Sequence, residues 1–161
     1  MTLGARYARR VQVLLLRRPA GRPRCEPPAA SSALRRGAEV ARGDLVDQLL
    51  IPQVEAGVCE ALRRQGDPLP AGELDAVGVV ETTTVASSIL AADIALKEAS
   101  VDLLDLRVAN GLGGKSFLTV TGEVSDVRSS VQAAAGSAES SGRLARHVVI
   151  ARPHPELSAH L

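Results

Sequence analysis

The chain has almost no aromatic residues: it contains no Trp, one Tyr and one Phe among its 161 residues. Aromatic side chains supply much of the core in many sandwich folds, so this core must consist of aliphatic side chains on regular helices and strands. Apolar residues nevertheless make up 45% of the chain, which is enough for one good core. The composition therefore favours a compact α/β or α+β module over an aromatic-rich sandwich.

Long apolar runs are lacking as well. The run near the start, VQVLLL at residues 11–16, stops at Arg17 and is too short for a membrane span or a signal peptide. The only cysteines, Cys25 and Cys59, have no cysteine or histidine at metal-ligand spacing. We therefore expect a cytoplasmic protein with no membrane partner and no metal.

The basic residues are concentrated at the beginning of the chain. Seven arginines fall within the first 30 residues, against the single acid Glu26. A nucleic-acid binder usually carries its basic residues on the folded module, next to aromatics when it binds single strands. We therefore expect no nucleic-acid partner, and we interpret residues 1–30 as an irregular or misread segment with one short strand at 11–16.

Regular patterns begin at residue 31. The expected elements of the front half are a helix over 31–43, a strand over 44–52, a helix over 54–64 and a linker over 66–73. Ser31 or Ser32 is the expected N-cap of the first helix, and Gly43 is its expected left-handed end.

An ordered series of strands and helices follows the linker. The expected elements are strands over 75–82, 101–109, 116–123 and 144–153, helices over 85–99 and 124–142, and a short final helix over 154–161. A threonine at 82–84 offers the N-cap of the first of these helices, and Val85, Ile89, Ala92 and Leu96 share one of its faces. The β-α-β-β-α-β order predicts an α+β, ferredoxin-like split fold over residues 74–161, a four-stranded antiparallel sheet with both helices on one face.

The front half repeats part of the back half. A shift of 99 residues lays residues 37–62 over 136–161 with five identities, at positions 37, 43, 45, 51 and 62. The shared order of helix end, glycine, apolar strand, turn and short helix strengthens the match. We therefore expect residues 31–65 to be the C-terminal part of a first copy, placed before the complete copy at 74–161.

The stretch ANGLGGKS, residues 109–116, ends like a phosphate-binding loop. Such a loop needs a helix directly after its Gly-Lys-Ser, because the helix N-terminus and its N–H groups surround the phosphate. Residues 117–123 predict a strand instead, so we interpret the stretch as a glycine connection between antiparallel strands. The alternative is a regulatory α+β module that binds a nucleotide or another small ligand at this loop.

No group of residues points to catalysis. Asp93 and Lys97 have the spacing of an ordinary ion pair on a helix surface. His147 falls within an expected strand and His154 follows Pro153, and spacing identifies no nucleophile or carboxylate partner for either. We expect no enzyme and no cofactor.

Five short motifs follow one another along residues 74–161. They are Glu81-Thr82, Ala92-Asp93 with Lys97, the loop Asn110 to Gly114, Thr121 to Val124, and Ala151-Arg152-Pro153-His154. In combination they resemble the shell proteins of bacterial microcompartments, the BMC-domain family, in which a proline stands in place of Ala151. The 99-residue repeat is similar to the tandem, trimer-forming subclass, with a truncated first domain.

The resemblance implies a structural protein of a microcompartment shell. Its implied partners are further copies in a pseudohexameric trimer, other shell proteins and enclosed enzymes. The loop residues Asn110, Gly111, Leu112, Gly113 and Gly114 are implied to line a central pore for small metabolites. A cofactor-carrying shell variant is a further alternative, but this loop lacks the cysteine that such a variant needs.

The same resemblance implies a tile edge at Asp93, Lys97, Arg152 and His154. Lys97 is implied to pack its aliphatic stem on the equivalent stem of a neighbouring tile, with Asp93 orienting it. Arg152 and His154 are implied to enter an edge pocket of the neighbour, where a planar guanidinium can donate several hydrogen bonds.

Overall fold

The computed structural model describes residues 10–15, 27–64, 74–108 and 114–159. The chain divides into two compact units, Met1–Val54 and Glu55–Leu161. In the part of the chain that is described, no helix is long and apolar enough to cross a membrane.

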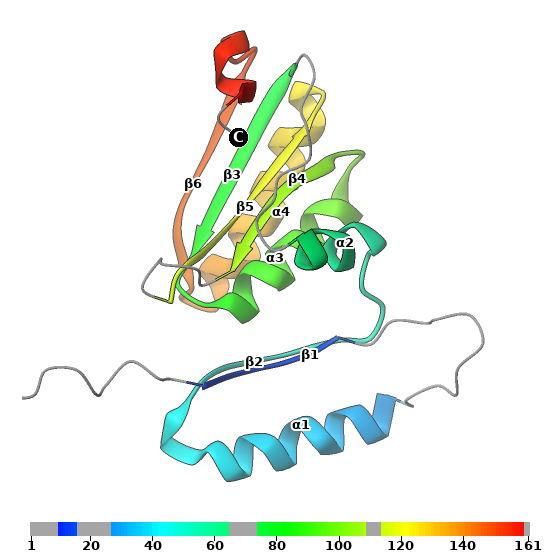
Figure 1. The fold of residues 1–161 in the computed structure, drawn as a ribbon, viewed down its shortest axis with the longest axis vertical. Coiled ribbons are helices and arrows are strands. Elements are labelled where there is room, and N and C mark those ends of the chain that lie inside the picture. The colour runs from blue at the N-terminus through cyan, green and yellow to red at the C-terminus, as the bar shows by residue number, and fades with distance from the viewer. Residues whose placement is uncertain (1–9, 16–26, 65–73, 109–113, 160–161) are drawn as a thin grey trace, which may run out of the picture. The chain divides into compact units, whose positions relative to one another are not determined.

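The first unit contains two strands joined by a helix (Figure 1). The strand β1 spans Arg10–Leu15, the helix α1 spans Pro27–Ala41 and the strand β2 spans Leu45–Ile51, with a 3₁₀ turn at Arg42–Asp44 before β2. The two strands pair in parallel, with Val13 opposite Leu49. Parallel neighbours need a crossover connection, and α1 supplies it by packing against both strands.

Both predicted ends of α1 are wrong. The helix begins at Pro27 rather than at Ser31 or Ser32. A proline is tolerated there because N–H groups of the first helical turn have no intrahelical partner. At the other end the left-handed residue is Arg42, with φ of 45°, and not Gly43.

The second unit has the predicted β-α-β-β-α-β order. Its strands are β3 (Ala76–Thr82), β4 (Asp102–Val108), β5 (Ser116–Gly122) and β6 (Leu144–Ala151), and its main helices are α3 (Val85–Glu98) and α4 (Val124–Ser140). The sheet order is β4-β5-β3-β6, and all neighbours are antiparallel. Both helices cover the same face of the sheet (Figure 1), which confirms the predicted fold.

Local signals set the ends of the main helices. The side chain of Thr84 accepts a hydrogen bond of 3.2 Å from the Ser87 N–H, so Thr84 is the N-cap of α3. After α4, Gly142 has a left-handed backbone with φ of 66°. The Arg143 N–H donates a hydrogen bond of 2.7 Å to the Ala138 carbonyl, so Gly142 ends the helical region. Both predictions are confirmed, whereas the expected final helix is a 3₁₀ helix, η2, over Pro155–Ala159.

The buried surface of α3 is wider than the predicted stripe. Ile89 and Ala92 are buried as expected, while Val85 and Leu96 are only half-buried. Ala95 is fully buried because α4 packs beside α3, and Ser130 of α4 donates a hydrogen bond of 3.0 Å to the Ala95 carbonyl. The helix therefore contacts both the sheet and its neighbour.

A further helix, α2 (Ala56–Arg64), belongs to the second unit in space. It packs against β4 and α3, although in sequence it lies within the stretch expected as the tail of a first copy. It thereby covers β4, which is an edge strand of the sheet, and an open edge is a surface that proteins commonly cover.

Candidate functional site

The predicted pore loop connects β4 to β5. Asn110, Gly111, Leu112 and Gly113 lie outside the described residues. Gly114 has φ of 92°, and a Cβ added to it would meet no atom within 4 Å. The left-handed backbone, rather than crowding, therefore requires glycine at this position.

The residues after the loop do not form a phosphate site. Ser116 opens β5, so a strand and not a helix follows the Gly-Lys-Ser. The N–H groups of a helix N-terminus are therefore missing from the place where a phosphate needs them. Instead, Lys115 Nζ lies 3.3 Å from Glu81 Oε1 at the end of β3.

A charged row that the sequence did not indicate lies beside this connection. Arg107 Nη2 is 3.0 Å from Asp105 Oδ2, and its guanidinium lies 5.4 Å from the centre of the Phe117 ring. Phe117 in turn stands opposite Glu81 across β5 and β3. Alternation along β4 puts 105 and 107 on one face, but only the strand register brings Phe117 next to them.

Of the four predicted edge residues, Asp93 and Lys97 are in contact. Asp93 is 3% exposed, and its Oδ2 accepts a hydrogen bond of 2.5 Å from Lys97 Nζ. Its Oδ1 accepts a second hydrogen bond of 2.8 Å from the backbone N–H of Glu55. The side chain of Lys97 is 40% exposed, whereas the side chain of Asp93 is only 4% exposed.

The other two edge residues lie at the end of β6, and both are accessible. The backbone of Arg152 is left-handed, with φ of 47°, and its N–H donates a hydrogen bond of 2.6 Å to the Asp75 carbonyl. Asp75 also accepts, through Oδ2, a hydrogen bond of 3.2 Å from the Val124 N–H at the start of α4. His154 Nδ1 lies 3.8 Å from Glu156 Oε2. Asp75 therefore holds the turn after β6 against α4, a role that sequence spacing did not reveal.

The register of the sheet separates the loop from the four residues that are predicted to lie at the tile edge. At one end Thr82 pairs with Ser116 and with Leu144, next to the β4–β5 connection. At the other end Ala76 pairs with Gly122 and with Ala151, just before Arg152. The α3–β4 turn, which follows Lys97, lies at this second end, because a Cβ on Gly122 would approach the Ser100 carbonyl to 3.1 Å. Lys97 and Arg152 thus share the end away from the loop but lie toward opposite edges of the sheet.

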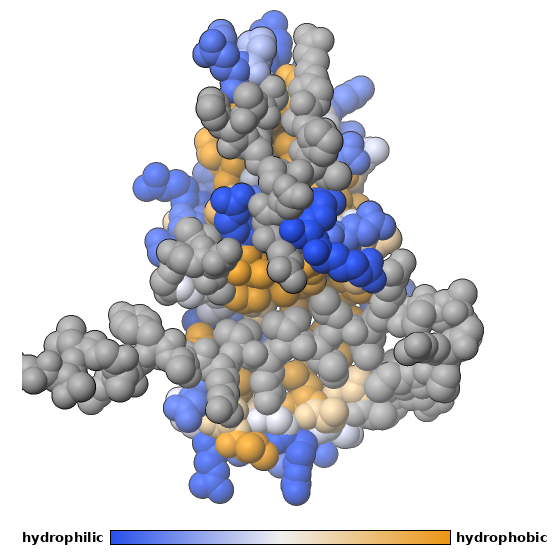
Figure 2. All heavy atoms as spheres, viewed as in Figure 1, coloured by the Kyte–Doolittle hydropathy of each residue, from blue (hydrophilic) through white to orange (hydrophobic). Residues whose placement is uncertain are grey.

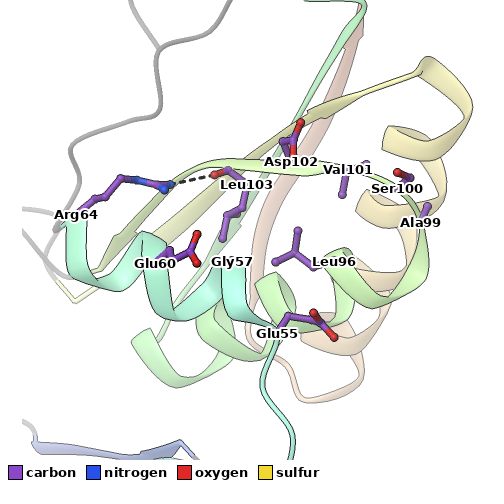
Figure 3. Close-up of a pocket in the computed structure, with 10 residues that line it drawn as sticks. All are labelled: Glu55, Gly57, Glu60, Arg64, Leu96, Ala99, Ser100, Val101, Asp102 and Leu103. Carbon is purple, nitrogen blue, oxygen red and sulfur yellow. Dashed lines mark hydrogen bonds between the residues drawn. The ribbon is translucent and has the colours of Figure 1, made fainter. Parts of the chain in front are cut away.

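A pocket of about 360 Å³ lies between α2 and the α3–β4 turn (Figure 3). It is lined by Glu55, Gly57, Glu60, Arg64, Leu96, Ala99, Ser100, Val101, Asp102 and Leu103. Arg64 is held in position at this pocket, because its Nη2 donates a hydrogen bond of 3.0 Å to the Leu103 carbonyl. No three His, Cys, Asp or Glu side chains among the described residues are grouped to hold a metal ion.

Apolar side chains reach the surface on β6. Val148 and Ile150 are 44% and 40% exposed and stand opposite Val79 and Val77 of β3. They lie on the face of the sheet away from α4, because the intervening Gly78 faces that helix. Figure 2 shows apolar residues between hydrophilic ones on the visible face of the second unit. Exposed apolar side chains on an edge strand are typical of a surface that another chain covers.

Comparisons with known proteins agree on one family. The family model of the BMC domain matches residues 76–153. The bacterial microcompartment shell protein PduT of Citrobacter freundii is 39% identical over 129 residues, which are 80% of this chain and 68% of that protein. The carboxysome shell protein CcmK2 of Synechococcus elongatus is 37% identical over 84 residues, 51% of this chain and 80% of that one.

A solved structure gives the same result. The crystal structure of a microcompartment protein from Desulfitobacterium hafniense superimposes with a TM-score of 0.70 at 37% identity, covering 83% of this chain and 73% of that chain. Proteins of this family oligomerise and assemble with other shell proteins. The chain therefore belongs to the BMC-domain family and is a structural, non-enzymatic protein of a bacterial microcompartment shell.

Proposed function

We propose that the chain forms a trimeric, pseudohexameric tile of the shell, in which residues 31–65 are the C-terminal part of a first BMC domain. In this tile the loop Asn110 to Gly114 surrounds a central pore for small metabolites. Asp93, Lys97, Arg152 and His154 lie at the edge where tiles meet. The elements of the front half carry this proposal, because they repeat those of the complete domain.

The element boundaries recur at the offset that the sequence repeat predicts. The helices α1 and α4 end at Ala41 and Ser140, and the strands β2 and β6 begin at Leu45 and Leu144, each pair 99 residues apart. The same offset relates the start of α2 at Ala56 to the start of η2 at Pro155.

One backbone hydrogen bond recurs at this offset as well. The Val58 N–H donates 3.2 Å to the Glu55 carbonyl, and the Leu157 N–H donates 2.9 Å to the His154 carbonyl. Equivalent turns after equivalent strands support an internal repeat more strongly than the sequence identities do. The alignment with PduT adds to this, since its 129 residues reach beyond the matched domain at 76–153.

The arrangement of the second unit is compatible with a tile. The β4–β5 loop and the edge residues lie at opposite ends of the sheet, so a ring with the loops at its axis presents Lys97, Arg152 and His154 at its rim. A closed ring of identical chains repeats one head-to-tail contact between two different, complementary surfaces, so a pore and a rim follow from a single symmetry axis.

Size-exclusion chromatography and negative-stain electron microscopy test the tile. Discs of trimer mass, present equally with and without ATP, support the proposal. Monomers that bind ATP with micromolar affinity contradict it and favour the nucleotide-binding alternative. Gly114→Ala tests the pore assignment, because it strains the left-handed backbone at the end of the loop. If the loop lines the pore, the variant should still form discs, but the flux of small solutes through reconstituted layers should change.

A further inference from the structure

The buried carboxylate of Asp93 holds two groups from different elements. Its Oδ1 accepts the backbone N–H of Glu55, the residue before α2, at 2.8 Å, and its Oδ2 accepts Lys97 Nζ at 2.5 Å. Asp93 is 3% exposed, so water has little access to replace either partner. A buried carboxylate depends on its partners for the hydrogen bonds that water supplies elsewhere.

The helix α2 is held against this site along its length. At its far end Arg64 Nη2 donates a hydrogen bond of 3.0 Å to the Leu103 carbonyl (Figure 3). It donates a second one, of 3.2 Å, to the Leu104 carbonyl. Nearer its start, a Cβ on Gly57 would lie 3.0 Å from Leu96 Cδ1, the neighbour of Lys97 in sequence. The position of the Glu55 N–H therefore depends on how α2 is seated on β4 and α3.

The direction of the Asp93 carboxylate depends on both partners. An aspartate side chain turns about few bonds, so a donor that fixes one oxygen also fixes where the other oxygen points. A lysine has a long stem with much rotamer freedom and takes the direction that its acceptor selects. Displacement of Glu55 would release one oxygen and allow the carboxylate, and with it the Lys97 ammonium, to turn.

We propose that Asp93 is a positioning residue that couples the seating of α2 to the orientation of Lys97. This coupling rests on the proposed tile edge. It makes lateral growth of the layer sensitive to the seating of α2, the first helix of the second unit. A chain in which α2 is not seated then presents Lys97 in the wrong direction for a neighbouring tile.

The lysine content of the chain allows a direct test. Lys97 and Lys115 are its only lysines, so acetylation of the full-length protein by an N-hydroxysuccinimide ester can be followed at both by peptide mass spectrometry. The rate at Lys115, which pairs with Glu81, serves as the internal reference. Hydrogen exchange of residues 55–64 reports the seating of α2 in the same samples.

Two variants disturb the two sides of the coupling. Arg64→Ala loosens α2 at the end opposite Glu55, and Asp93→Asn keeps an acceptor for the Glu55 N–H but removes the charge that holds Lys97. We expect each to raise the Lys97 to Lys115 rate ratio by about threefold or more. In Arg64→Ala local opening of α2 disturbs the carboxylate that holds Lys97, and in Asp93→Asn the charge that holds it is gone. Arg63→Ala is the matched control, since Arg63 is an exposed arginine on the same helix.

An unchanged ratio in Asp93→Asn overturns the proposal, as does an unchanged ratio in Arg64→Ala despite faster exchange in residues 55–64. A rise of equal size in Arg63→Ala overturns it as well. The tile edge is judged separately: variants with a raised ratio that still form normal layers would support the coupling and contradict the place of Lys97 at the edge.

Discussion

Gly78 of β3 lies directly beneath Val131 of α4. A Cβ at position 78 would overlap Val131 Cγ2 and lie 2.9 Å from Val127 Cγ1, so only glycine allows this close approach of helix and sheet. We expect Gly78→Ala to lower the free energy of unfolding by about 1–3 kcal/mol, the usual cost of overpacking. Urea denaturation followed by circular dichroism at one matched protein concentration measures it.

Gly136 of α4 is the control for this change. It is exposed, and a Cβ there would meet no atom within 4 Å. Alanine should therefore stabilise the helix by roughly 0.5–1 kcal/mol, because glycine is a poor residue in a helix interior. Equal losses at both positions would show that the contact of Gly78 with α4 is not the cause.

Two buried serines are expected to respond in opposite directions. Ser88 Oγ is buried without a hydrogen-bond partner, so Ser88→Ala should raise the free energy of unfolding by about 1 kcal/mol by removing an unsatisfied hydroxyl. Ser130 donates 3.0 Å to the Ala95 carbonyl, so Ser130→Ala should lower it by about 0.5–1 kcal/mol. Thermal and urea unfolding of both variants test this, and destabilisation by Ser88→Ala would reveal a partner for that hydroxyl.

The N-cap of α3 should be worth about 1 kcal/mol, the common cost of losing such a cap. Thr84→Ala removes the acceptor for the Ser87 N–H, and we expect the corresponding decrease in urea stability. Thr83→Ala alters an exposed neighbour whose backbone N–H, and not its side chain, bonds to Arg143. If Thr83→Ala costs as much as Thr84→Ala, capping is not the origin of the effect.

Lys97→Ala should leave discs intact and stop the growth of layers. The change removes a partly exposed side chain at the proposed tile edge, while Asp93 keeps the Glu55 N–H as a partner. Lys115→Ala removes the other lysine, beside the loop at the opposite end of the sheet, and should leave layer growth unchanged. Electron microscopy of the unchanged protein and the two variants at equal concentration measures layer growth. Normal layers from Lys97→Ala would refute the placement of Lys97 at the tile edge.

The sequence alone determined the elements of the second unit and their order. Alternating apolar residues, a threonine cap within 82–84 and the glycine at 142 act over a few positions along the chain, so their effect can be predicted without a fold, although only the structure shows that Thr84 is the cap. The ion pair of Asp93 with Lys97 was predictable for the same reason, because helix geometry brings residues four apart together. The pore role of residues 110–114 stays a prediction, since most of that loop lies outside the described residues.

Tertiary structure decided what depends on residues far apart in the chain. Glu55 and Asp93 are 38 positions apart, and only the packing of α2 on α3 and β4 makes the Glu55 N–H the second partner of that carboxylate. The start of α1 at Pro27 and the left-handed turn at Arg42 also departed from the local preference for serine caps and glycine ends. The propensities of single residues for helix caps and helix ends differ by less than a few kcal/mol, so contacts between elements can override them. The alternation of apolar residues along a strand is harder to override, because a shift by one residue would turn every apolar side chain of the strand to the opposite face.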